Sequence, residues 1–245
     1  MTQAPASPPV KPGAQTLAQV QLFAALPAAQ RQALEKRCRW RTYKEDEQII
    51  DRETDTQDVF FVVSGRARVV NYSAAGREVS FDDIGPGGCF GELSALDGQP
   101  RSAAVVAIRP TLAASLPAAA FREILDTHPP VAQSLLRRLA EIVRESTDRI
   151  MDLSTLGAHN RVYAELLREA HESDPKAFER GANQASIRPI PVHSDIAARV
   201  STTRETVARV LGELARKGIV ERDSDALLLR DVARLAKMVK EFRAD

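Results

Sequence analysis

The chain contains only two cysteines in 245 residues, Cys38 and Cys89, and their spacing matches no metal-binding pair. Two thiols cannot build a disulfide framework or supply the four thiolates of an iron–sulfur cluster. Apolar runs are short too, since the longest, 103–108 and 112–121, fall well below the roughly 18 residues of a membrane-spanning helix. The first residues lack the basic and apolar segments of a secretory signal. We therefore expect a cytoplasmic chain without membrane spans.

An excess of charge of one sign is also missing, because 34 Lys and Arg balance 33 Asp and Glu to a net charge of +1. This balance argues against a strongly basic coat protein for nucleic acid, so any contact with DNA must be confined to a local basic surface. Hydrophobic residues make up 44% and charged residues 27%, as in ordinary folded proteins. A chain of this length suits two domains and a connector.

The pattern of the first half changes from helical to β-type. Residues 1–16 hold four prolines and no apolar period, so we expect a flexible tail. Apolar residues recur at helical intervals over 17–37 and predict two short helices that meet at Pro27. Between Trp40 and Ser115, short β-type runs such as 59–63 and 67–70 are separated by turn residues. This region predicts an antiparallel barrel or jelly roll, a β-roll with flanking helices.

The longest helical pattern starts at two prolines after His128 and reaches about Leu156. Its apolar seam has the three-and-four spacing of a coiled coil, with one polar interruption at Ser146; the apolar members are Leu135, Leu139, Ile142, Ile150 and Leu153. This spacing predicts a helix that holds a homodimer together, with a helix packed only within its own chain as the alternative.

The last third of the chain starts at a break over Gly157-Ala158, which we interpret as a hinge. Asn160 is predicted to cap a helix that runs through Ala170. The polar stretch 172–186 is predicted to be a loop, and a compact helical segment and a short β-like run at 226–229 follow it.

The first motif that carries chemistry spans residues 90–104 and reads FGELSALDGQPRSAA. It consists of a turn, one turn of apolar helix, a second turn and an Arg-Ser-Ala run. The start of a short helix presents free N–H groups to an anion, and the guanidinium of Arg101 adds a positive charge that fits a phosphate. The Glu92 carboxylate can accept hydrogen bonds from a sugar hydroxyl. The alternative is an ordinary loop closed by an ion pair between Arg101 and Glu92.

The second motif spans residues 193–211 and reads HSDIAARVSTTRETVARVL. Ala197 stands where two crossing helices need a small residue, which is helix-turn-helix spacing. Ser201 occupies the turn position that favours glycine, because the backbone there is left-handed. On the second helix the predicted buried stripe is Val207, Val210, Leu211 and Leu214, and the predicted outward face is Arg204, Glu205, Ala208 and Arg209.

Two features complete the predicted DNA-binding segment. Thr203 can cap the second helix, whose N-terminal half would enter the major groove. Residues 220–227 follow as a predicted hairpin wing. A solvated helical hairpin with incidental arginines is the alternative.

Both motifs, in this order and joined by the seam helix, resemble the superfamily of the cyclic AMP receptor protein and the fumarate and nitrate reduction regulator, from about Leu22 to Asp231. The resemblance implies an α+β chain with an N-terminal antiparallel β-roll, a long dimerisation helix and a C-terminal winged helix-turn-helix. The corresponding domains are a tail (1–16), a cyclic-nucleotide-binding β-roll (17–129), the dimerisation helix (130–156) and the DNA-binding domain (157–245).

The resemblance also implies the site residues. The cyclic nucleotide would be held by Gly91, Glu92, Leu93, Ser94, Arg101, Ser102 and Ala103, with Ser146 and Thr147 holding the adenine from both subunits. DNA would be contacted by Thr203, Arg204, Glu205 and Arg209. The implied protein is a homodimeric transcription regulator that takes cyclic AMP as an allosteric ligand. Its partners would be inverted repeats of TGTGA-like half-sites and RNA polymerase.

There are three alternatives to a regulator that responds to cyclic AMP. The same architecture could respond to cyclic GMP or another effector, since Ser102 could also contact a guanine, or it could act without any nucleotide. A haem or iron–sulfur sensor is disfavoured because the cysteines are too few and all four histidines, His128, His159, His171 and His193, lie outside the β-type region. No nucleophile elbow, Walker loop or paired metal ligands appear, so we expect neither an enzyme nor a bound metal.

Overall fold

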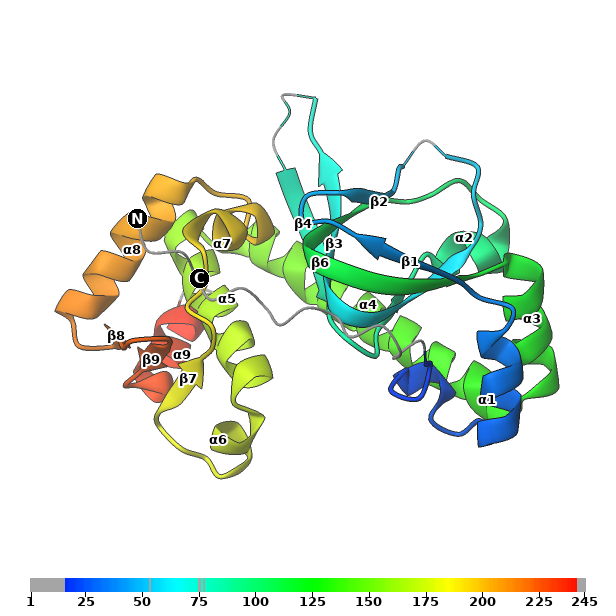
Figure 1. Cartoon of the computed structure of the whole chain (residues 1–245). Helices are drawn as coiled ribbons and strands as arrows, with labels where there is room; N and C mark the ends of the chain where they lie inside the picture. Colours follow the sequence, from blue (N-terminus) through cyan, green and yellow to red (C-terminus); the bar gives the residue numbers. More distant parts are fainter. Residues whose placement is uncertain (1–15, 53, 75, 77, 242–245) are drawn as a thin grey trace. The chain divides into compact units, whose positions relative to one another are not determined.

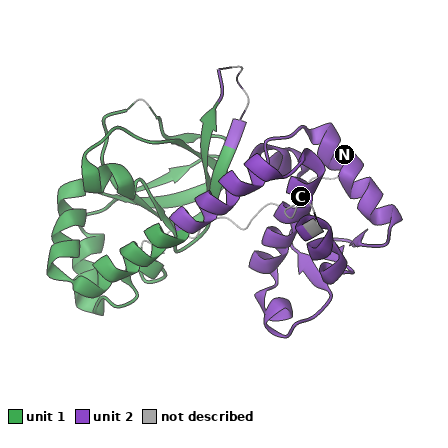
Figure 2. Ribbon diagram, turned by 180° about the vertical axis from the view of Figure 1, so that it is seen from behind, with its two compact units in different colours: residues 1–72, 80–141 green, residues 73–79, 142–245 purple. Residues whose placement is uncertain are grey.

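The computed structural model describes residues 16–52, 54–74, 76 and 78–241 (Figure 1). The predicted tail thus lies outside the described residues except for its last member, Thr16. The chain divides into two compact units, residues 1–72 with 80–141 (unit 1) and residues 73–79 with 142–245 (unit 2), as coloured in Figure 2. No helix in the described ranges is long and apolar enough to cross a membrane.

Unit 1 is an antiparallel β-roll with helices beside it. Its elements are η1 (Gln21–Phe23), α1 (Ala28–Glu35), β1 (Arg39–Tyr43), β2 (Gln48–Ile50), β3 (Val59–Tyr72), β4 (Glu78–Ile84), β5 (Cys89–Phe90), α2 (Glu92–Asp97), β6 (Ala104–Leu116) and α3 (Ala118–Thr127). The strands follow the order β1-β6-β3-β4, with β2 added to β6 and β5 to β3. The two short N-terminal helices and the jelly-roll type of fold agree with the sequence prediction, although the sheet is not a closed barrel.

The turn predicted between the runs 59–63 and 67–70, at Ser64-Gly65, is not formed, because β3 continues through it as one strand of 14 residues. The pairing register of β3 with β6 shifts between Val62 and Ala67. The hydrogen-bonded pairing is therefore irregular here, but the chain does not reverse its direction. Gly65 has φ +86°, and a Cβ there would come within 2.2 Å of the carbonyl oxygen of Pro110. A glycine is therefore needed at a close approach between strands rather than at a turn.

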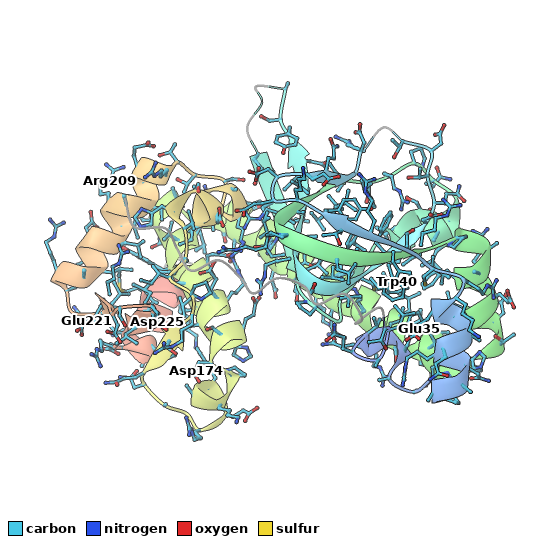
Figure 3. All side chains as sticks on the ribbon, viewed as in Figure 1. Glu35, Trp40, Asp174, Arg209, Glu221 and Asp225 are labelled. Atoms are coloured by element: carbon cyan, nitrogen blue, oxygen red, sulfur yellow. The ribbon has the colours of Figure 1, made fainter. Side chains whose placement is uncertain are left out.

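Apolar clusters hold unit 1 together, and two of them are larger than the rest. The core under the N-terminal segments includes Phe23, Phe61 and Phe121, each without exposed surface. Glu35 ties the start of the described chain to this core, because its carboxylate accepts hydrogen bonds from the Thr16 hydroxyl and the Leu17 N–H (Figure 3). A second cluster around Val62, Ile84 and Phe90 lies inside the roll.

Helix α4 (Pro129–Thr155) begins in unit 1 and ends in unit 2. Leu135 is 3% exposed and Leu139 packs against the same core, so both serve the fold of unit 1. The seam predicted from the sequence is therefore wrong at Leu135, whereas Leu139 is half-buried and stays a predicted seam residue. Three exposed apolar residues of α4 recur at seven-residue intervals, Leu136, Val143 and Ile150, which are 65%, 64% and 62% exposed. Ile150 and the exposed Leu153 belong to the predicted seam, and Met151 is exposed as well.

Unit 2 has the order of a winged helix-turn-helix. Its elements after α4 are α5 (Ala158–Ser173), α6 (Pro175–Glu179), β7 (Ala185–Ile187), α7 (His193–Arg199), α8 (Arg204–Arg216), β8 (Val220–Arg222), β9 (Leu227–Leu229) and α9 (Val232–Glu241). The three strands form a sheet in the order β7-β9-β8, so β8 and β9 form the predicted wing.

Two predictions for this unit are wrong. The stretch 172–186 is not a plain loop, because Asp174 caps α6 by accepting from the Ala177 N–H, Pro175 opens that helix and Ala185 begins β7. Asn160 is not a cap, since α5 already starts at Ala158 and Asn160 is buried within it.

A cluster of buried and half-buried charges lies between the C-terminal end of α4 and helices α5 and α7. Arg168 contacts Asp152 at 2.7 Å and Glu165 at 3.0 Å. Arg199, the last residue of α7, contacts Glu165 at 3.4 Å and also pairs with Glu169. The side chains of Asp152 and Glu165 are each 3% exposed. These five residues are called the ion cluster below.

The ion cluster makes the stability of the protein depend on pH. Burial raises the pKa of Glu169 from an ordinary 4.5 to about 7, with Glu165 and Glu172 adding to the rise and Arg199 opposing it. The folded protein thus keeps a proton that the unfolded chain releases at lower pH, so this contribution to stability is lost as the pH rises from about 4.5 through about 7.

We therefore expect the free energy of unfolding of the wild-type protein to fall between about pH 5 and about pH 8, relative to that of the Glu169→Gln variant. Urea denaturation at several pH values measures it. Glu179→Gln, an exposed position on α6, is the control and should follow the wild type. If the difference in the free energy of unfolding between the wild-type protein and the Glu169→Gln variant were constant across this pH range, the prediction would be contradicted.

Candidate functional site

The segment 90–104 forms a compact turn around helix α2. Gly91 has φ +81°, and a Cβ there would lie 2.7 Å from Nη1 of Arg101 and 2.9 Å from the carbonyl oxygen of Asp58. A side chain would clash with this packing and strain the backbone, so glycine is required. Gly98 ends α2, also in the left-handed conformation. The motif thus forms a short helix whose first N–H groups are free of helical partners, as the sequence predicts.

Arg101 fills the centre of this turn and is only 4% exposed. Its guanidinium donates to the carbonyl oxygens of Gly91 at 2.9 Å and Asp58 at 2.8 Å, and to the Thr56 hydroxyl at 3.3 Å. Burial lowers the pKa of Arg101. Among the described residues no carboxylate forms an ion pair with this guanidinium. A buried cation that has only neutral hydrogen-bond partners is a site for an anion.

Glu92 opens α2 beside Arg101 and is 5% exposed. Burial raises the pKa of its carboxyl, opposed by a backbone hydrogen bond and by the charges of Arg138 and Arg101. Its Oε2 is buried and accepts no hydrogen bond from the described part of the chain. The predicted alternative, an ion pair between Arg101 and Glu92, is not formed in this region. The buried acceptor is instead available to a donor such as a sugar hydroxyl.

The remaining predicted residues of the segment are placed around these two. Ser94 is buried, Leu93 is 42% exposed, Ser102 is exposed and Ala103 is half-buried. Asn71 of β3, which the sequence analysis missed, donates from Nδ2 to the carbonyl oxygen of Ser102 at 3.2 Å.

Three further neighbours of the segment were missed. Thr56 and Asp58 hold Arg101, and Arg138 of α4 donates to the carbonyl oxygen of Cys89 at 2.9 Å, just before the motif. No local pattern announces them, since each lies more than 40 residues from its partner in the chain.

Ser146 and Thr147 lie exposed on α4. The Thr147 hydroxyl donates to the Val143 carbonyl oxygen at 2.8 Å, which leaves its lone pairs available as acceptors. Both residues belong to unit 2, whereas the 90–104 segment belongs to unit 1. A site shared by these residues and the segment therefore stays a prediction.

Helices α7 and α8 form the predicted helix-turn-helix. Ser201 in the turn has φ +50°, the left-handed conformation that its position predicts. The Thr203 hydroxyl caps α8 by accepting from the Thr206 N–H at 3.2 Å. Arg161 of α5 holds the turn in place, because its guanidinium donates to the carbonyl oxygens of Val200 at 2.8 Å and Ser201 at 3.2 Å.

Helix α8 has one buried face and one exposed face. Val207, Val210 and Leu214 are fully buried against α5 and α7. The predicted outward residues Arg204, Glu205, Ala208 and Arg209 are all exposed, and Figure 3 labels Arg209. No ion pair is formed by Arg204 or Arg209 with any described residue. A cationic free face at the start of a capped helix fits the major groove of DNA.

A metal site has no support in the described ranges, where no group of three or more His, Cys, Asp or Glu side chains could hold an ion. Cys38 and Cys89 are both free thiols, and burial raises the pKa of each to about 12. Such thiols are poor nucleophiles and poor ligands at neutral pH.

A β-roll that contains a turn built around a buried guanidinium, followed by a winged helix-turn-helix, is the architecture of a DNA-binding regulator with its own ligand-binding domain. Known proteins agree with this class. Residues 40–128 match the family described as cyclic nucleotide-binding domain, and residues 160–238 match the Crp-like helix-turn-helix domain.

Individual relatives share the architecture. The chain is 32% identical over 198 residues to the cyclic AMP receptor protein of Thermus thermophilus, covering 81% of this chain and 87% of that protein. It is 29% identical over 182 residues to the CRP-like cAMP-activated global transcriptional regulator of Mycobacterium tuberculosis, covering 74% and 80%. A CooA mutant from Carboxydothermus hydrogenoformans has the same fold, with a TM-score of 0.77 at 22% identity over 92% of this chain and 99% of that chain.

The chain belongs to the family of the cyclic AMP receptor protein and the fumarate and nitrate reduction regulator. It is therefore a DNA-binding transcription regulator with a cyclic-nucleotide-binding domain, and its relatives are regulators rather than enzymes.

Proposed function

We propose that this regulator binds cyclic AMP in the 90–104 segment and that the ligand switches a homodimer to a DNA-competent state. Arg101 and the first N–H groups of α2 hold the cyclic phosphate, and Glu92 accepts from the ribose. The rest of the pocket is Gly91, Leu93, Ser94, Ser102 and Ala103. Ser146 and Thr147 of the two subunits hold the purine. The observation that carries the proposal is the buried guanidinium of Arg101, which has only neutral partners among the described residues.

Calorimetric titration with cyclic AMP and with cyclic GMP tests the ligand. We expect one cyclic AMP site per subunit and weaker binding of cyclic GMP. Tighter binding of cyclic GMP than of cyclic AMP would make cyclic GMP the proposed ligand. Binding of neither nucleotide would overturn it and favour a regulator that acts without one.

The dimer is proposed to form along the exposed apolar residues of α4. Leu136, Val143 and Ile150 stand at one position of a seven-residue repeat, and Leu153 follows Ile150 by the three-residue step of a coiled coil. Large apolar side chains with more than three fifths of their surface exposed are stabilised by a partner helix.

Val143→Glu should produce monomers, because a dimer would bury two unpaired carboxylates in an apolar contact. Sedimentation equilibrium measures the result. Leu139→Glu, the substitution that the predicted seam favours, is less suitable because Leu139 also packs against the core of unit 1, so its replacement would disturb the fold as well. Glu141→Lys changes a charge on another exposed face of α4 and is the control. A Val143→Glu protein that sediments as a dimer would contradict this interface.

The proposed DNA site is an inverted repeat of TGTGA-like half-sites, read by Arg204, Glu205 and Arg209 from helices capped by Thr203. A two-fold dimer places its recognition helices about 34 Å apart, one turn of DNA. A regulator of this kind works with RNA polymerase in the cytoplasm, and we place the protein there.

A further inference from the structure

The ion cluster joins the helix that precedes the hinge to the first helix of the DNA-binding pair. Asp152 belongs to α4, Glu165, Arg168 and Glu169 belong to α5, and Arg199 belongs to α7. Arg168 contacts both Asp152 and Glu165, and Glu165 also contacts Arg199. The contacts therefore run without a break from α4 through α5 to α7.

The ion cluster is a costly way to hold three helices together. Charges that leave water lose hydration, and an apolar cluster of similar volume is often as stable or more stable. Three carboxylates here face two guanidinium groups, and Oε2 of Glu169 is buried without a hydrogen bond from the described chain. Stability alone does not account for such an arrangement.

Ion pairs of arginine provide direction, which apolar contacts do not. The planar fork of Arg168 reaches carboxylates on two different helices, so it fixes the orientation of one helix against the other. Arg199 ends α7 and directly precedes the turn whose Val200 carbonyl oxygen accepts from Arg161. The C-terminal end of α7 is thus held at its side chain and at its backbone.

We propose that the ion cluster is a positioning device, which sets the orientation of the DNA-binding helix pair relative to the C-terminal end of α4. In a dimer built on α4, this orientation sets the distance between the two recognition helices. The cluster thereby determines the spacing of the half-sites that the dimer accepts. None of its five residues needs to touch DNA. The inference rests on the dimer and DNA-binding parts of the proposed function.

The test measures spacing selectivity rather than affinity alone. A site selected from random DNA is prepared with its two half-sites at the selected spacing, and with the spacer changed by about one and about two base pairs. Wild-type protein should lose about tenfold or more in affinity when the spacer changes. The Asp152→Asn variant keeps the shape of the side chain but removes its charge. Its affinity for DNA should fall less than about threefold when the spacer changes, because its DNA-binding helices can change their orientation more easily. Asp148→Asn, the same change at an exposed position one turn earlier on α4, should behave as the wild type.

A destabilised protein would weaken binding to every spacer alike, so a structural effect alone would not flatten the spacing profile. If thermal unfolding shows that Asp152→Asn does not fold, Arg168→Lys replaces it, since this variant keeps the charge and loses the fork. Wild-type spacing selectivity in a folded Asp152→Asn or Arg168→Lys protein would overturn the inference and leave the proposed function intact. A wild-type protein that selects no inverted repeat would overturn both.

Discussion

The Arg101→Ala variant is expected to lose cyclic AMP binding by more than tenfold while the protein stays folded. A buried phosphate deprived of a guanidinium loses charge-assisted hydrogen bonds worth about 1.5 to 3 kcal/mol each. The cation is 4% exposed, so water cannot take its place easily. Two lost bonds would correspond to roughly two to four orders of magnitude in affinity. Calorimetric titration of the purified protein with cyclic AMP measures the effect.

Controls separate the charge from the fold. Arg101 also donates to the carbonyl oxygens of Gly91 and Asp58, so its removal disturbs the turn as well. Arg101→Lys keeps a positive charge but cannot reach both carbonyl groups in the same geometry, and it should recover part of the affinity. Arg109→Ala removes an exposed arginine of β6 and should bind as the wild type. An Arg101→Ala protein with native circular dichroism and unchanged affinity would show that the phosphate is held elsewhere.

The two functional motifs could be predicted from the sequence because each one is local. The glycine turn and short helix of the 90–104 segment and the capped helix of the 193–211 segment are set mainly by neighbours in the chain, although Thr56 and Asp58 hold Arg101 from a distance. Even the left-handed backbone at Ser201 follows from its place in the motif. Local patterns failed where tertiary packing decided the outcome, as in the strand through Gly65 and in the helix that contains Asn160.

The exposed apolar face of α4 could be predicted only in part, because α4 is apolar on more than one face. Leu135 and Leu136 are adjacent leucines, yet the first is buried in unit 1 and the second is 65% exposed. The sequence gives both the same hydrophobicity. Which leucine faces the core is decided by where the β-roll lies against α4, and that is a tertiary property.

The ion cluster and the partners of Arg101 were missed for the same reason. Arg168 meets Asp152 from 16 residues away, and Arg199 meets Glu169 from 30 residues away. Their individual charges look like those of any solvated helix. Only the packing of α5 against α4 and α7 turns them into a buried network.

The second large effect is expected at the DNA. Arg209 lies exposed on α8, two turns from the Thr203 cap, with no ion pair to any described residue. Such a guanidinium can donate to O6 and N7 of one guanine through both arms of its fork. Arg209→Ala should cost about 1 to 3 kcal/mol at each half-site. Over two half-sites this is roughly a 30-fold to 10⁴-fold loss of affinity.

The sequence preference distinguishes a base contact from a phosphate contact. In a selection from random DNA, Arg209→Ala should flatten the preference at one guanine of each half-site and leave the other positions unchanged. Arg216→Ala, at the far end of α8, should weaken all sequences alike or leave binding unaltered. Because α8 is capped independently of Arg209, the variant helix should stay folded. If Arg209→Ala selected the same guanine as strongly as the wild type, Arg209 would not read that base, and Arg204 would become the residue to test.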